Sequence, residues 1–205
     1  MNAKDWRGAG LEVRSLTGGD IAAAIPDVAA LRIAVFREFP YLYDGDAAYE
    51  ERYLAALAAS PRAIVVVAQE GGRIVGAATG APLTDVEDDW SAPFLAAGLS
   101  VEQRFYCAES VLLPGWRGLG LGHAFFDGRE AHARRLGMTE SCFCSVMRPD
   151  DHPARPADHR PHDAFWHKRG YAPLPGIAAS YAWRDIGRDE ETSKVLRFWG
   201  RSLSA

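Results

Sequence analysis

The chain is short of cysteine, of long apolar runs and of basic charge, and each shortage excludes a class of protein. Three cysteines in 205 residues are too few for a disulfide framework. No apolar run approaches the ~20 residues that cross a bilayer, and the first ten residues lack the apolar core of a secretory signal. We therefore expect a cytoplasmic protein without a membrane partner, whose cysteines are buried strand thiols rather than redox or metal groups.

Basic residues are also too few to suggest a nucleic-acid partner. The chain has 23 Lys and Arg against 27 Asp and Glu, a formal net charge of -4, whereas a domain that binds nucleic-acid phosphates is usually basic. What the chain does have is a globular composition, 48% hydrophobic and 24% charged, and enough length to bury one full core.

Hydrophobic periodicity and turn residues divide the chain into strands and helices. Expected strands lie at 11–16, 63–69, 73–83, 105–113 and 140–147, with two more between 171 and 186. Expected helices begin near residues 20, 47, 92, 121 and 163. This order predicts an α+β fold in three layers, with a mixed, mostly antiparallel sheet covered by helices. The strand at 105–113, the helix after it and the strand at 140–147 form one parallel β-α-β unit.

Three glycines stand at the entrance of the helix in that unit, in "WRGLGLGHAFF" from Trp116. Main-chain N–H groups at such a turn can approach a large anion. A P-loop would require a lysine that is missing here, and a dinucleotide fingerprint would require glycine where the chain has His123. The pattern that does fit is Arg117-x-x-Gly120-x-Gly122. The alternative to an anion site is a tight strand-to-helix turn that binds nothing.

This pattern resembles the acyl-CoA motif of the GNAT N-acetyltransferase superfamily, and "FWHKRGY" at 165–171 is similar to that family's second signature. The resemblance implies a GNAT acyl-CoA N-acyltransferase fold over residues 10–187, with 188–205 as a C-terminal tail packed on the domain. It also implies acetyl-CoA as co-substrate, no metal, a small-molecule or peptide amine as acceptor, and a monomer or homodimer.

The resemblance further implies which residues bind the cofactor. The main chain of the strand that ends at Leu113 would bind the pantetheine arm, and the glycine turn would bind the pyrophosphate. The implied cofactor-binding residues are Val111, Leu112, Leu113, Arg117, Gly118, Leu119, Gly120, Leu121, Gly122, His123 and Trp166.

For catalysis, Glu109 is the candidate base, because a carboxylate in an apolar strand is costly unless it is paired or functional. The alternative is a structural ion pair with an arginine. The usual acid of the family is absent, because Trp166 stands where many relatives have a tyrosine and an indole N–H supplies no proton. Ser110, Tyr171, His162 and His167 are candidate donors, the alternative for Tyr171 being a core tyrosine, and the thiolate could also take its proton from water.

The acceptor side is expected in the loop "FREFPYLYDGD". Phe39, Tyr41, Tyr43 and Asp44 would form an aromatic wall with an acidic group suited to a cation, and the alternative is ordinary packing between helices. Four histidines at 152–167 match no standard metal-ligand spacing.

Two functions of different classes follow. The first is an acyltransferase that moves an acetyl group from acetyl-CoA to an amine by direct attack. The second is a non-catalytic module that binds acyl-CoA as a sensor or scaffold.

Overall fold

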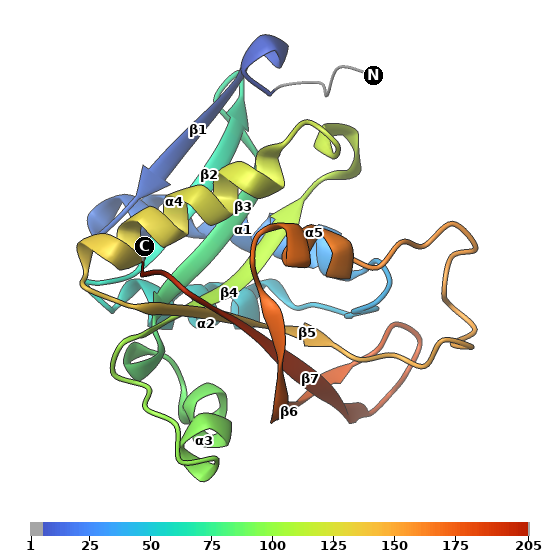
Figure 1. The fold of residues 1–205 in the computed structure, drawn as a ribbon. Coiled ribbons are helices and arrows are strands. Elements are labelled where there is room, and N and C mark those ends of the chain that lie inside the picture. The colour runs from blue at the N-terminus through green and yellow to red at the C-terminus, as the bar shows by residue number, and fades with distance from the viewer. Residues whose placement is uncertain (1–5, 205) are drawn as a thin grey trace.

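The computed structural model describes residues 6–204, and its centre is a seven-stranded sheet in the order β1-β2-β3-β4-β5-β7-β6 (Figure 1). All neighbouring strands within this part of the chain are antiparallel except β4 and β5. The strands are β1 (Leu11–Leu16), β2 (Ile64–Glu70), β3 (Arg73–Pro82), β4 (Arg104–Leu112), β5 (Glu140–Val146), β6 (Ala172–Arg184) and β7 (Glu191–Ser202). The expected fold class is confirmed.

Helices cover both faces of the sheet. Figure 1 shows α4 crossing the near face, α5 beside it, and α1 and α2 behind the strands. The helices are α1 (Gly19–Phe36), α2 (Ala47–Ala58), α3 (Asp88–Ala96), α4 (Leu121–Arg135) and α5 (Asp163–Lys168), with short 3-10 turns η1 (Trp6–Ala9), η2 (Leu83–Asp85) and η3 (Pro114–Trp116). None of the helices in residues 6–204 combines the length and the apolar character needed to cross a membrane.

The apolar run of β2 shows why this strand lies in the middle layer. Alternate side chains of a strand point to opposite faces: Val66 packs in the core beneath α4, whereas Val65 and Val67 pack in the core beneath α1 and α2. All three are essentially inaccessible. A strand buried on both faces therefore needs no polar alternation.

The C-terminal segment differs from its expected position. Residues 188–205 were expected to pack on the domain as a tail, but Glu191–Ser202 form β7, which pairs with β5 on one side and with β6 on the other. Phe198 and Trp199 are fully buried in the cores on its two faces. The two short strands expected between 171 and 186 are one strand, β6, with a register shift between Pro173 and Ala178.

The parallel pair β4–β5 opens along its length. Pairing covers only Arg104–Tyr106 with Glu140–Cys142, and beyond these residues the two strands diverge (Figure 1). The sheet is thus held together at one end of these strands and split at the other. The candidate site lies at this split.

Candidate active site

A cavity of about 680 Å³ lies where β4 and β5 part, between α1, α2 and the β6–β7 hairpin. Such a volume suits a small-molecule ligand. Nine of its lining residues are aromatic: Phe36, Tyr41, Tyr43, Tyr49, Tyr53, Trp90, Tyr106, Tyr181 and Trp183. Trp90 stacks between Tyr106 and Tyr181, with ring centroids 5.5 Å and 5.3 Å away. The walls are therefore flat, rigid and rich in π faces.

The charge of the lining is negative. Six carboxylates line the cavity, Asp44, Asp46, Glu50, Glu109, Asp189 and Glu191, against the two guanidinium groups of Arg32 and Arg184. Both arginines already pair with lining carboxylates. Aromatic faces combined with surplus carboxylates attract a cation such as an ammonium group.

Glu109 reaches this cavity because β4 carries a bulge. Thr79 of β3 pairs with Glu109, but the next pair is Ala81 with Tyr106, so β4 has one residue more than β3 between these pairs. As a result, consecutive residues Ala108 and Glu109 both line the cavity. An extra residue reverses the alternation of a strand: Cys107 packs beneath α4, whereas Val111 packs beneath α1 and α2.

The Glu109 carboxylate belongs to a buried cluster of three charges. Arg32 of α1 forms ion pairs with both Glu109 and Glu50 of α2, and the three residues are 7%, 9% and 0% exposed respectively. Burial alone would lower the pKa of Arg32, but the carboxylates of Glu109 and Glu50 outweigh it and raise the pKa. Arg32 therefore stays charged, and the cluster carries one surplus negative charge. The ion pair with an arginine, which was the alternative for Glu109, is therefore present. Its members Arg32, Glu50 and Glu109 also line the cavity.

The expected acceptor loop contributes three of its four named residues to the cavity. Tyr41, Tyr43 and Asp44 line it, whereas Phe39 packs against the rings of His152 and His159, at 4.7 Å from the latter. Asp44 binds Arg37 and Arg184 at 2.9 Å and 3.0 Å.

Residues after β5 and in β6 bind the main chain of the same loop. Arg148 donates to the carbonyl oxygens of Pro40 and Tyr41 at 2.8 Å and 2.7 Å, and it pairs with Asp185. Trp183 Nε1 also donates to the Tyr41 carbonyl at 3.0 Å. These bonds fix the main chain that carries two lining tyrosines.

The glycine turn lies between β4 and α4. Gly118 and Gly120 have φ angles of 77° and 85°, a left-handed conformation that residues with a Cβ rarely adopt. No main-chain carbonyl of residues 6–204 accepts from the N–H groups of residues 118–122, whereas His123 N donates to the Gly120 carbonyl at 3.0 Å. Five free donors at the N-terminus of a 15-residue helix form a site that fits an anion.

Arg117 connects this turn to the acceptor loop. Its guanidinium donates to both carboxylate oxygens of Glu38, at 2.8 Å and 3.1 Å, and its Nε donates to the Leu112 carbonyl at 3.0 Å. Arg117 thus stabilises the end of β4 and the turn that follows α1.

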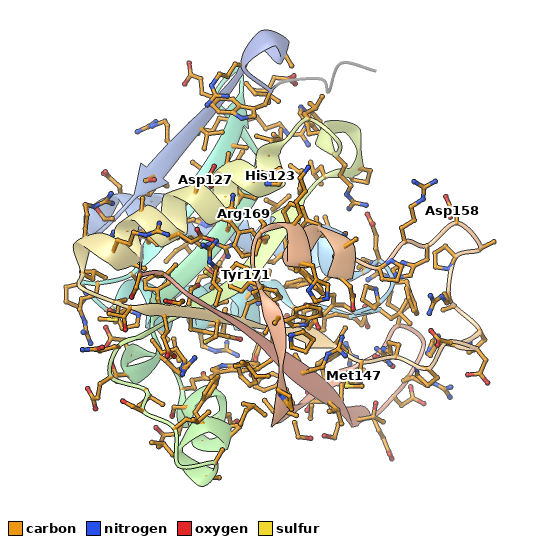
Figure 2. The ribbon with its side chains drawn as sticks, viewed as in Figure 1. His123, Asp127, Met147, Asp158, Arg169 and Tyr171 are labelled. Atoms are coloured by element: carbon orange, nitrogen blue, oxygen red, sulfur yellow. The ribbon has the colours of Figure 1, made fainter. Side chains whose placement is uncertain are left out.

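Two of the expected catalytic residues do not reach the cavity. The bulge turns Ser110 to the opposite face, where its Oγ accepts from Arg129 at 2.8 Å. Tyr171 is 1% exposed, and its hydroxyl bonds Ser141 at 2.8 Å and Glu130 at 3.1 Å. Figure 2 shows Tyr171 beside Arg169 and facing α4. Burial, together with nearby Cys107 and Glu130, raises the pKa of Tyr171. Its burial and its bonded hydroxyl fit the alternative reading, a core tyrosine.

Other hydroxyl groups do reach the cavity, and reasoning from the sequence missed them. The Tyr53 hydroxyl lies 3.5 Å from Glu109 Oε2, and the Tyr106 hydroxyl lies 3.1 Å from Cys144 Sγ. Burial raises the pKa of both tyrosines well above the usual value, and both are neutral donors. Trp166 instead packs its ring 4.9 Å from that of Trp199 and does not line the cavity. In the sequence, only the spacing of Tyr49, Glu50 and Tyr53 along one helix could have indicated that these side chains line the cavity together.

The histidine-rich segment between β5 and α5 contributes no metal centre within residues 6–204, where no group of three or more His, Cys, Asp or Glu residues could hold an ion. Asp158 lies on the outward part of this loop (Figure 2).

Burial raises the pKa of Cys144 to about 12, so the thiol in the cavity is uncharged.

Comparisons with known proteins agree with this geometry. Residues 29–171 match the model of the acetyltransferase (GNAT) family. Among solved structures, the chain is similar to a ribosomal-protein-alanine N-acetyltransferase from Brucella melitensis (TM-score 0.60, 15% identity, covering 93% of this chain and 99% of that one). It is also similar to yncA from Salmonella typhimurium, solved with acetyl-CoA (TM-score 0.58, 15% identity, 95% of each chain).

A third similar structure is a polyamine N-acetyltransferase from Drosophila melanogaster (TM-score 0.57, 14% identity, 94% of this chain and 99% of that one). Identities this low establish a shared fold and nothing about the acceptor. No curated protein matches the chain.

Proposed function

Because the chain belongs to the GNAT acetyltransferase family, we propose that it transfers an acetyl group from acetyl-CoA to a primary amine that enters the cavity as a cation. The observation that carries this proposal is the position of Glu109. The bulge in β4 places this carboxylate inside an aromatic, negatively charged cavity, which lies where β4 and β5 part.

The fit to acetyl-CoA rests on two features of this chain. The free N–H groups of residues 118–122 suit the pyrophosphate, and the main chain at 111–113 lies where β4 has parted from β5, so the pantetheine arm would lie along it there. Leu119, His123 and Trp166 would flank the bound molecule, whereas Leu121, whose side chain is buried, would contribute its N–H group. Acetyl-CoA would supply the acetyl group as a thioester.

The chain's own residues prepare the amine for direct attack. The ammonium would enter among the tyrosines and lose a proton to Glu109, directly or through water. The neutral nitrogen then forms the C–N bond as the C–S bond breaks. The second proton, which the nitrogen loses as the amide forms, passes through Tyr106, Tyr53 or water to the departing thiolate. Arg32 holds the Glu109 carboxylate in place through their ion pair. Because burial raises the pKa of the Cys144 thiol, it is a weak nucleophile, which supports direct attack over an acyl-enzyme.

Binding is tested first, by calorimetric titration of the protein with acetyl-CoA, CoA and NAD. We expect micromolar acetyl-CoA binding, lost in a Gly120→Asp/Gly122→Asp variant because the added carboxylates occupy and repel at the anion site. Gly98→Asp, at another left-handed glycine that lies after α3, is the matched control and should bind normally. A folded protein that binds none of the three ligands would contradict the proposal.

Turnover is tested with Glu109→Gln. With an amine panel of butylamine, 1,4-diaminobutane, phenethylamine and an alanine-ended peptide, we expect kcat to fall about 10²–10⁴-fold while the Kd for acetyl-CoA is unchanged. The second candidate, a non-catalytic acyl-CoA module, is favoured by Trp166 at the position of the usual tyrosine. Acetyl-CoA binding without turnover on any amine would support that module instead.

The cytoplasm stays the proposed compartment. Support comes from the three free cysteines, which are stable in a reducing environment. The proposal also includes a small-molecule or peptide amine as the acceptor, and a monomer or homodimer as the oligomeric state.

A further inference from the structure

Arg129 is a buried cation that the reaction outlined above does not use. It lies on α4, on the face of the sheet opposite the cavity, and it is 1% exposed. Within residues 6–204, no carboxylate lies at ion-pair distance from its guanidinium. A buried charge without a counter-ion is costly, so its other bonds must compensate.

All of those bonds go to the main chain and hydroxyl around the bulge, or to its own helix. Nη1 donates to the Glu109 carbonyl at 2.8 Å and to the Thr79 carbonyl at 3.2 Å, and Nη2 donates to Ser110 Oγ at 2.8 Å. Nε donates to the Phe125 carbonyl at 3.3 Å. Thr79 and Glu109 form the last strand pair before the register shift.

The guanidinium thus binds both strands at the point where β4 gains its extra residue. The alternation of β4 reverses there, so Ser110 faces α4 while Glu109 faces the cavity. Without the extra residue, Glu109 would share the face of Cys107, beneath α4. Arg32 holds the Glu109 side chain from the cavity face, and Arg129 holds the Glu109 main chain from the other face.

From these contacts we infer that Arg129 is a positioning residue for the transfer reaction: it clamps the β4 bulge and so directs Glu109 into the cavity. This inference rests on the proposed function through the role of Glu109. The planar fork is essential, because it reaches two carbonyls and a hydroxyl with fixed angles, whereas a lysine ammonium offers no such geometry.

The test compares Arg129→Lys with Arg104→Lys. Arg104 is the control because it is also a buried arginine, at the other end of β4, and it pairs with Glu140 away from the cavity. Kinetics are measured well below the melting temperature of each variant. We expect Arg129→Lys to lower kcat at least about tenfold without changing the Kd for acetyl-CoA, and Arg104→Lys to leave kcat within about twofold.

A double variant separates positioning from general loosening. If Arg129 acts through Glu109, then Arg129→Lys has no further effect on kcat in a Glu109→Gln background. If the two losses multiply, or if Arg129→Lys keeps full kcat, the inference is overturned. If Glu109→Gln itself keeps full kcat, Glu109 is not the base. The contact between Arg129 and the β4 bulge is then tested by a measurement that does not depend on kcat.

Amide hydrogen exchange provides that independent measurement. We expect the amides of residues 107–110 to exchange at least about tenfold faster in Arg129→Lys than in the wild type, with no change there in Arg104→Lys. Equal protection in all three proteins would overturn the clamp. If Arg129→Lys does not fold, Ser110→Ala removes one of the clamp's acceptors, and unchanged exchange at 107–110 in that variant overturns it equally.

Discussion

Replacing Arg32 by methionine should destabilise the protein strongly, and by an amount that depends on pH. The substitution keeps an unbranched, flexible side chain but removes the cation shared by Glu50 and Glu109, which are 0% and 9% exposed. Removing one partner of a buried ion pair costs about 3–5 kcal/mol, because the remaining charge is left uncompensated. For a chain of this size, that corresponds to a drop of about 6–20 °C in Tm.

The sign of the pH dependence follows from proton binding. Buried carboxylates without a cation favour the protonated form, so the folded variant binds more protons than its unfolded state at pH values just above the usual carboxyl range. The stability of such a state falls as pH rises. The loss relative to the wild type should therefore be larger at pH 8 than at pH 5.

Differential scanning calorimetry at pH 5 and pH 8 measures both effects. Arg32→Met/Glu50→Gln is the control, and it should regain a large part of the lost Tm because one uncompensated carboxylate has gone. A Tm within about 2 °C of the wild type at pH 8 would refute the charge cluster as described. An equal loss at both pH values would refute the reasoning from proton binding.

The remaining predictions concern the bulge, the acceptor loop and the cavity thiol. Gly80→Ala should cost about 1–3 kcal/mol in a urea titration, because its Cβ would lie 2.9 Å from the Tyr106 carbonyl. Burial would raise the pKa of Asp185, but hydrogen bonds led by that from Arg148 lower it. Asp185→Asn should therefore be less stable than the wild type at pH 7, and the difference should shrink as pH falls below 4. Cys144, with its pKa near 12, should react with iodoacetamide at pH 8 far more slowly in the native than in the denatured protein, as peptide mass spectrometry can measure.

Each of these predictions has an outcome that contradicts it. A Gly80→Ala protein as stable as the wild type would mean that the bulge adapts without strain. A constant difference for Asp185→Asn from pH 7 to pH 3 would mean that its ion pair contributes nothing. Rapid alkylation of Cys144 in the native state, or its acetylation by acetyl-CoA, would mean that the thiol is ionised and would reopen a covalent route.

Much of the secondary structure could be predicted because it depends on local patterns. The β-branched run of β2 and the glycine turn before α4 are both signals contained in a few neighbouring residues. The tail was misplaced because the apolar residues Phe198 and Trp199 show that a segment is buried, but not which strands it pairs with. β7 lies between β5 and β6 only in the assembled sheet.

The sequence by itself determined the class of fold, the family and the glycine turn before α4, since each follows from residue types at fixed spacing along the chain. Only the tertiary structure decided what Ser110, Tyr171 and Glu109 can do. A strand's alternation is local, but its reversal depends on how many residues the partner strand places opposite, and here β3 is one residue short at Gly80. The partners of Glu109 lie far away in the chain, so the cavity, its charge and its clamp exist only after the elements have packed.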